Sequence, residues 1–407
     1  MCAPAVTAAA DSVLPEAISA PSRRTRAVRV GIDTDVAHGA VVPPLHLSSN
    51  FSFAAFGEKR PFDYTRSGNP TRQILADALA ELEEGHGAVV TSSGMSAVTL
   101  VLQLVPAGGS IVCAHDCYGG TWRLLQSLAT RGLFTLHLVD LTQDSAVARI
   151  EALAPSLVWI ETPSNPLLRI TDVRTICAAA QRAGALSVVD NTFLSPALQR
   201  PLTLGADIVV HSTTKYLNGH SDVVGGAVIA RNEQIIEQLS FWANCLGVTG
   251  APFDSYLTLR GVRTLYPRLA LHEANAQLIA EALDGHPAVR AVHYPGLRSH
   301  PGHALAASQQ DGFGAMLSFE LAGGSDAVRA LTASLRCFTL AESLGGVESL
   351  IAHPATMTHA SMAPEARAVA GITDGLVRLS VGIEHGEDLR DDLLSGLDRV
   401  LNTGWAR

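Results

Sequence analysis

Lysine, charged residues and aromatic residues are all scarce in this chain of 407 residues. Lys59 and Lys215 are the only lysines among 29 basic residues, 16% of the residues are charged and 5% are aromatic. The net charge of −9 provides no basic face that could neutralise a nucleic-acid backbone or an anionic lipid surface. The composition therefore argues against nucleic acids and membranes as partners.

Cysteine is also infrequent, and its spacing does not suggest pairing. Six cysteines without a CxxC pair are typical of reduced thiols in a cytoplasmic protein. The length suffices for roughly two or three domains without disulfide staples. Residues 1–20 are rich in alanine but lack the apolar core of a secretory signal, so we expect a disordered extension there.

The longest uncharged run, residues 87–114, is the segment that could be mistaken for a transmembrane helix. It exceeds the roughly 20 residues that span a bilayer, but serines, glycines and Pro106 interrupt it. We therefore expect a buried strand, a turn and a helix. We expect no metal site either, because no HExxH motif occurs and His293, His300 and His303 lie in a predicted loop.

The hydrophobic pattern indicates an α/β fold. Residues 72–84 are expected to form an amphipathic helix with Thr71 as its N-cap and Gly85 as its stop. Apolar runs then alternate with helical segments, which is typical of buried parallel strands joined by crossover helices. From about residue 270 amphipathic helices dominate, which indicates a smaller C-terminal α+β domain.

Polar residues follow these predicted strands, where ligands of open α/β sheets collect. Ser93, Gly94 and Met95 open a predicted helix whose N-terminus could bind an anion such as phosphate, although by itself the pattern favours a Ser-Gly turn that simply caps the helix. Asp190 ends one strand, and an aspartate there can also be a simple helix cap. Lys215 follows the next strand along the chain.

A lysine in an apolar segment is costly to keep charged, and Schiff-base formation with a carbonyl is its best attested use. Asp190 could pair with a pyridinium nitrogen, as enzymes that use pyridoxal 5′-phosphate (PLP) require. Ser212 and Thr214, beside Lys215, could hold the cofactor phosphate. The strand ends therefore suggest a PLP site.

These residues lie in motifs that resemble those of the PLP-dependent Cys/Met metabolism family. Eight motifs occur in order from about residue 30 to the C-terminus: YTRSGNPTR, TSSGMSA, HDCYGGTWR, ETPSNPLLR, VVDNTFLSPALQ, HSTTKYLNGHSDVVGG, FTLAESLGGVESLIAHPATMTH and VRLSVGIE. The resemblance implies PLP fold type I, the aspartate aminotransferase-like fold, with a mostly parallel seven-stranded sheet. It implies an N-terminal arm over residues 1–66, a PLP-binding domain over 67–270 and a small domain over 271–407.

The resemblance also assigns roles to individual residues. Lys215 would bind the cofactor aldehyde and act on protons, Asp190 would hold the ring nitrogen, and Tyr118 would stack on the ring. The phosphate would be held by residues of this chain together with two from a neighbouring subunit: Ser93, Gly94, Met95, Ser212 and Thr214, then Tyr64 and Arg66. The active site would thus be shared within a dimer, and two dimers would form a tetramer.

The substrate residues decide which branch of the family the chain resembles. Arg378 would bind the α-carboxylate, and Asn165 would contact the ring oxygen or the substrate. Glu342 and Ser343 match members that form or cleave cystathionine, and Arg123 could accept the distal carboxylate of an O-succinyl group. The resemblance favours γ-replacement, joining O-succinylhomoserine or another O-acylhomoserine to cysteine in methionine biosynthesis, with γ-elimination of cystathionine as the alternative.

Overall fold

A computed structural model of the chain describes residues 21–360, 367–368 and 370–402. The expected disordered extension over residues 1–20 lies outside the described residues. The strands of the first sheet are β1 (Gly87–Thr91), β2 (Ser110–Ala114), β3 (Thr135–Val139), β4 (Leu157–Glu161), β5 (Leu186–Asp190), β6 (Ile208–His211) and β7 (Gly226–Ala230). Those of the second are β8 (Val289–His293), β9 (Met316–Leu321), β10 (Thr339–Leu340), β11 (Leu350–Ala352) and β12 (Leu376–Ser380).

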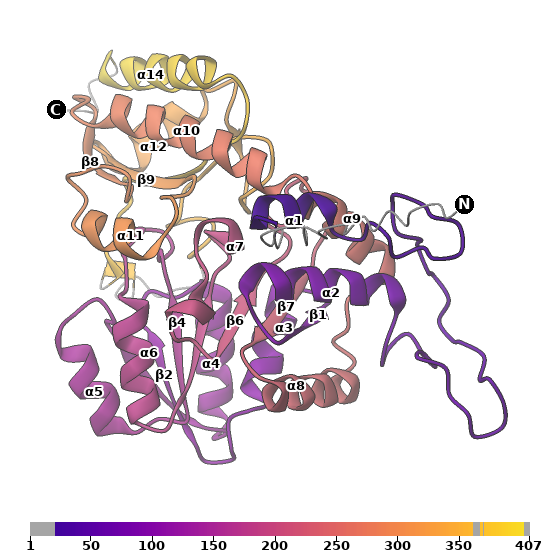
Figure 1. The fold of residues 1–407 in the computed structure, drawn as a ribbon. Helices are drawn as coiled ribbons and strands as arrows, with labels where there is room; N and C mark the ends of the chain where they lie inside the picture. The colour runs from indigo at the N-terminus through magenta and orange to yellow at the C-terminus, as the bar shows by residue number, and fades with distance from the viewer. Residues whose placement is uncertain (1–20, 361–366, 369, 403–407) are drawn as a thin grey trace, which may run out of the picture.

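Helices flank both faces of the large sheet and cover the small one (Figure 1). The first group is α1 (Arg23–Arg29), α2 (Pro70–Glu83), α3 (Gly94–Leu102), α4 (Gly119–Thr130), α5 (Ser145–Leu153), α6 (Val173–Arg182), α7 (Ser195–Leu198) and the 3₁₀ helix η1 (Pro201–Leu204). The second group is α8 (Glu233–Leu246), α9 (Pro252–Val262), α10 (Leu265–Leu283), α11 (His303–Gln309), α12 (Gly324–Thr332) and α14 (Gly386–Asn402).

The large sheet has seven strands in the order β1-β7-β6-β5-β4-β2-β3, which confirms the predicted fold class. β7 pairs antiparallel with both β1 and β6, whereas the remaining pairs are parallel. Six strands therefore run in one direction and β7 alone is reversed. As a consequence, the carboxyl ends of β1, β4, β5 and β6 open at the same edge of the sheet.

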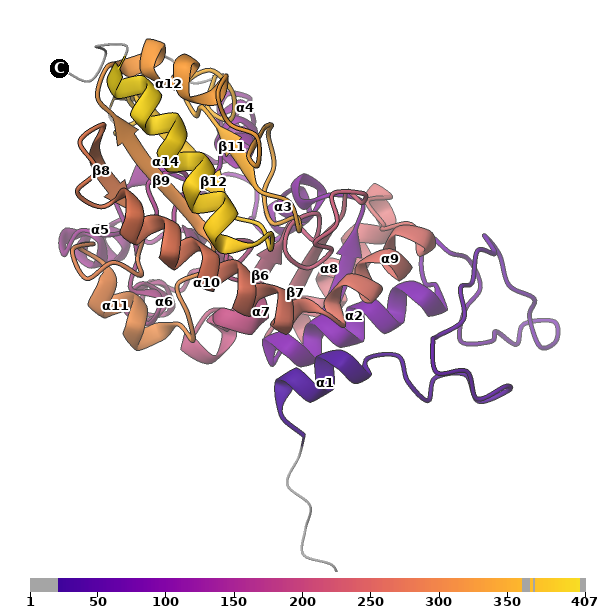
Figure 2. The same cartoon turned by 90° about the horizontal axis from the view of Figure 1, so that it is seen from above.

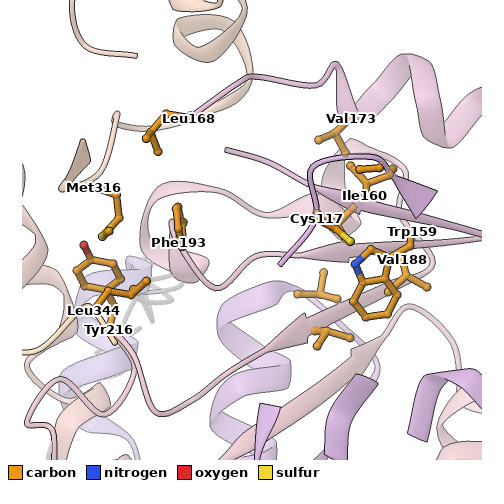
Figure 3. Packing of buried hydrophobic residues seen from close by; sticks show 14 of the residues in the cluster. Cys117, Trp159, Ile160, Leu168, Val173, Val188, Phe193, Tyr216, Met316 and Leu344 are labelled. Carbon is orange, nitrogen blue, oxygen red and sulfur yellow. The ribbon is translucent and has the colours of Figure 1, made fainter. Parts of the chain in front are cut away.

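The second sheet has the order β10-β11-β12-β9-β8 and is mostly antiparallel. One hydrophobic core runs between the two sheets: Tyr216, Leu344 and Met316 lie together at one side of it, and Trp159 packs near Val188 (Figure 3). α10 contacts α14, β8 and β9 but begins before the predicted domain boundary at residue 270. The three-way division of the chain stays a prediction.

The start of α2 differs from the sequence expectation. Asn69, in extended backbone conformation, accepts from the N–H groups of Thr71 (3.0 Å) and Arg72 (3.2 Å), so the N-cap is Asn69 and not Thr71. Pro70 suits the first helical position because the N–H that it lacks is unbonded there anyway. At the other end Glu84, with φ of 60°, takes the left-handed position expected for Gly85.

Residues 30–69 form an arm between α1 and α2 that projects away from the body of the molecule (Figures 1 and 2). The predicted buried strand, turn and helix over residues 87–114 are β1, the short turn after it and α3, and the segment ends in a second strand, β2. Among the described residues, no helix is both long and apolar enough to cross a membrane.

Candidate active site

A cavity of about 650 Å³ lies at the shared edge of the large sheet, where residues of the second sheet's loops close it. Residues from β1, β4, β5 and β6 reach it directly after their strands end. Thirteen of the predicted site residues line it: Ser93, Gly94, Met95, Tyr118, Arg123, Asn165, Asp190, Ser212, Thr214, Lys215, Glu342, Ser343 and Arg378.

Tyr64 and Arg66, the two residues expected to reach a neighbouring subunit, do not line this cavity. Both belong to the arm, and Tyr64 is 49% exposed. The Arg66 Nη1 atom donates to the backbone oxygen of Asn244 at 2.7 Å within the same chain. Their contact with a partner's site stays a prediction.

The N-terminus of α3 borders the cavity. Ser93 is its N-cap, because its Oγ accepts from the N–H of Ser96 at 3.0 Å. The N–H groups of Gly94 and Met95 have no acceptor in the part of the chain that the structure describes. A Cβ on Gly94 would lie 2.8 Å from the Cβ of Ser212, so only glycine allows this close approach to the end of β6. Two backbone donors and the hydroxyls of Ser212 and Thr214 thus border one part of the cavity, which suits a phosphate.

Asp190 ends β5 and borders the cavity beside Val210. One carboxylate oxygen accepts from the N–H of Thr192 at 3.0 Å. Burial raises the pKa of Asp190, while that hydrogen bond and the nearby His211 partly oppose the rise. A cationic ring nitrogen would favour the charged carboxylate, so the site fits a protonated pyridine.

Lys215 lines the cavity. Burial, with the positive charge of Arg378, lowers the pKa of Lys215 to about 8 against the opposing effect of Glu342. Its Nζ donates to the Oγ of Ser343 at 2.6 Å. An amine with this pKa is a nucleophile near neutral pH, which covalent capture of an aldehyde requires.

This pKa predicts how cofactor capture depends on pH. The neutral amine attacks the aldehyde, so the rate at which apo-protein captures PLP should rise with pH through about 8 and level off above it. The measurement is the initial absorbance change after mixing with PLP at different pH values. A midpoint near 10.5, the ordinary value for lysine, would contradict the prediction.

Arg378 and Ser343 line the cavity next to Lys215. The Arg378 guanidinium donates from Nη1 to Asn165 Oδ1 at 3.0 Å and from Nη2 to the Ser343 backbone oxygen at 2.9 Å. Its Nε is buried without a partner among the described residues. Ser343 has a φ of 81°, a strained conformation that costs about 1–3 kcal/mol and recurs at functional sites. Ser343 thereby bonds Lys215 with its side chain and Arg378 with its backbone.

Replacing Arg378 should weaken the use of substrate much more than the binding of PLP. Loss of one partner of a buried charge pair costs about 2–5 kcal/mol, so Arg378→Ala should lower kcat/KM by roughly 30- to 4,000-fold. Arg378→Lys should recover only part of this, because lysine lacks the planar fork. Arg182→Ala, whose side chain is exposed at the end of α6, is the control. An Arg378→Ala enzyme with wild-type kcat/KM would refute the role.

Glu161 is a cavity residue that the sequence analysis missed. It ends β4 opposite Asp190, is 6% exposed, and its Oε2 accepts from the N–H of Tyr118 at 2.7 Å. Burial, with the charge of Asp190, raises the pKa of Glu161 well above its usual range. Glu161 therefore positions the backbone of Tyr118, whose side chain is 43% exposed at the cavity. The sequence feature that could have identified Glu161 is its position at the end of an apolar run.

Two of the three histidines of the predicted loop have local partners. His303 stacks on Phe313 and its Nδ1 bonds to the Pro295 oxygen at 2.8 Å. His300 accepts from the N–H of Gly302, and His293 ends β8.

Known proteins share the sequence pattern and the fold of this chain. The sequence profile described as "Cys/Met metabolism PLP-dependent enzyme" matches residues 24–398. This chain belongs to that family. Cystathionine γ-synthase of Escherichia coli K12 is 56% identical over 381 residues, which cover 93% of this chain and 98% of that protein.

Two further relatives extend this comparison. The crystal structure of cystathionine γ-synthase from Xanthomonas oryzae pv. oryzae in complex with cystathionine has 63% identity and a TM-score of 0.93, covering 95% of this chain and 100% of that one. A cystathionine β-lyase of Lactococcus lactis subsp. cremoris is 46% identical over 378 residues, covering 93% of this chain and 99% of that protein. The protein is thus a PLP-dependent enzyme of fold type I.

The residues present fit PLP. Asp190 suits the ring nitrogen, the free N–H groups of α3 with Ser212 suit the phosphate, and Lys215 suits the aldehyde. These three parts border one cavity.

Proposed function

We propose that this enzyme joins an O-acylhomoserine to L-cysteine and releases the acyl group as a carboxylic acid, the reaction of a cystathionine γ-synthase. The observation that carries the proposal is the 63% identity, over 95% of the chain, to an enzyme of that name whose structure holds cystathionine. In this reaction the bond from Cγ to the acyl oxygen breaks and a bond from Cγ to the cysteine sulfur forms. The product is cystathionine.

When bound, PLP supplies a ring that accepts electrons and stabilises negative charge on the substrate Cα. Lys215, whose amine would hold the cofactor aldehyde, would take the proton from the substrate Cα and then act at Cβ. Its pKa of about 8 suits it to take and return protons near neutral pH. The hydroxyl of Ser343, 2.6 Å from Nζ, fixes the position of that amine.

Two arginines set the orientation of the substrate. Arg378, held by Asn165 and the Ser343 backbone, binds the α-carboxylate so that Cα faces Lys215. Arg123, on α4 at the cavity, binds the distal carboxylate of a succinyl group. Tyr118, which lines the cavity, would stack on the cofactor ring and take part in proton transfer. Ser67, where some succinyl-using members carry a second arginine, belongs to the arm and does not line the cavity.

The decisive experiment is a substrate panel with purified, PLP-loaded protein. O-Succinylhomoserine with cysteine should give cystathionine and succinate as the main products. The same donor without cysteine should release 2-oxobutyrate more slowly. O-Acetylhomoserine in a parallel series tests the acyl group, and Arg123→Ala should reduce the preference for the succinyl donor.

Cleavage of cystathionine is the second candidate, because a relative named cystathionine β-lyase is 46% identical. Cystathionine as the sole substrate separates the outcomes. Dominant release of cysteine and 2-oxobutyrate would identify γ-elimination, and dominant release of homocysteine and pyruvate would identify β-elimination. Either would overturn the synthase proposal.

We also propose a homotetramer of two dimers in the cytoplasm, with each active site shared within a dimer. The exposed arm that carries Tyr64 and Arg66, outside its own cavity, supports an intersubunit role for these residues. Light scattering of the purified protein measures the assembly.

A further inference from the structure

A buried polar cluster lies next to the strand ends that border the cavity. Glu83, the last residue of α2, and His211, the last residue of β6, are 0% and 1% exposed. Glu83 Oε1 lies 2.6 Å from His211 Nε2 and accepts from Asn191 Nδ2 at 2.8 Å. A carboxylate without partners is costly to bury. Each of these three side chains therefore stabilises the positions of the other two.

Gln199 extends the cluster to a third strand. Asn191 Nδ2 also donates to the Gln199 backbone oxygen at 2.8 Å, and Gln199 Nε2 donates to Asn191 Oδ1 at 3.2 Å. The same Nε2 reaches the backbone oxygen of Thr162, directly after β4, at 3.4 Å. The cluster thus joins α2 to the ends of β4, β5 and β6.

Two residues of the cluster are sequence neighbours of residues that line the cavity. Asn191 follows Asp190, and His211 precedes Ser212. Successive side chains of a strand point to opposite faces, so Asp190 and Ser212 face the cavity while their neighbours face the cluster. Two further bonds tie the two ends together: the Asn191 N–H donates to the Val210 oxygen at 3.0 Å, and the Ser212 N–H donates to Thr192 Oγ1 at 2.9 Å.

We propose that Glu83, His211 and Asn191 are positioning residues for PLP. They hold Asp190 and Ser212 at the spacing that the ring nitrogen and the phosphate require, and they do so before the cofactor binds. This role rests on the use of PLP by the family and not on the choice of γ-replacement among its reactions.

The test compares PLP affinity with folding. His211→Ala should raise the PLP dissociation constant of the folded apo-protein by roughly 10- to 100-fold, the range seen when residues that orient metal ligands are removed. The conservative Glu83→Gln keeps an oxygen acceptor and should remain within a few-fold of the wild type. Glu81→Ala, on the half-exposed part of the same helix beside Arg26, is the matched control and should bind PLP normally.

Three measurements decide the result: PLP titration, the pH dependence of the bound cofactor's absorbance, and the melting temperature of the apo-protein. A His211→Ala protein that melts earlier but binds PLP with unchanged affinity and spectrum would show a purely structural role and overturn the proposal. A wild-type protein that binds PLP normally but forms no cystathionine would count against the proposed reaction instead.

Wild-type protein provides a test that does not depend on the variants folding. If the cluster orders the strand ends in advance, the amides of Asn191 and Ser212 should be protected from hydrogen exchange in the apo-protein as well as with PLP. Fast exchange of both amides without PLP, and protection only with it, would mean that the cofactor itself orders these ends, and the proposal would fail.

Discussion

Lys215→Ala is expected to lower the rate of cystathionine formation by at least about 10⁴-fold while the protein keeps its fold. General acid–base catalysis alone contributes roughly 10²–10⁴-fold, and this substitution also removes the amine that holds the cofactor covalently. Arginine cannot replace it, because a guanidinium stays protonated and does not attack carbonyls. The measurement is the initial rate of cystathionine formation at saturating PLP.

The chain contains a matched control, since Lys59 is the other lysine. Lys59 is exposed on the arm and pairs with Asp63 at 2.8 Å, so Lys59→Ala should retain activity. Borohydride reduction of the wild type followed by peptide mass spectrometry should find pyridoxyl on the Lys215 peptide and none on the Lys59 peptide. Label on Lys59, or an active Lys215→Ala enzyme, would refute the assignment.

The cavity-lining residues of the strand ends could be predicted from the sequence because each follows an apolar run directly. Asp190 and Lys215 need no knowledge of distant contacts, only the rule that parallel strands end at one edge. The reversed strand β7 was not predicted. Its run, GAVIA, follows β6 without an intervening helix, so the alternation of strands and helices that marks the other strands is missing there.

The residues that were missed depend on contacts between distant parts of the chain. Glu83 and His211 are 128 positions apart, and neither has a partner near it in sequence that marks the pair. Glu161 reads as the start of a turn until its burial beside Asp190 is known. Met357 and Thr358, which reach the cavity from the loop after β11, likewise depend on how the second sheet packs. Periodicity describes one element at a time and does not encode such pairings.

Asp190→Asn should give the second largest effect, a loss of about 10²- to 10⁴-fold in catalytic rate. The substitution keeps the size of the side chain and can keep the bond from the Thr192 N–H, but it removes the negative charge. Removing one partner of a buried charge pair costs about 3–5 kcal/mol, which corresponds to this range. The ring nitrogen would then lose its proton more readily, and the ring would stabilise negative charge at Cα less well.

The control for Asp190→Asn is Asp140→Asn, because Asp140 follows β3 of the same sheet, bonds Thr142 and does not line the cavity. The pH titration of the bound cofactor's absorbance separates electronic from structural effects. Asp190→Asn should shift that titration and slow exchange of the substrate Cα proton, while the apo-protein melts as the wild type does. If the variant exchanges the Cα proton at the wild-type rate, Asp190 does not hold the ring nitrogen, and the cofactor must lie in the cavity in another orientation.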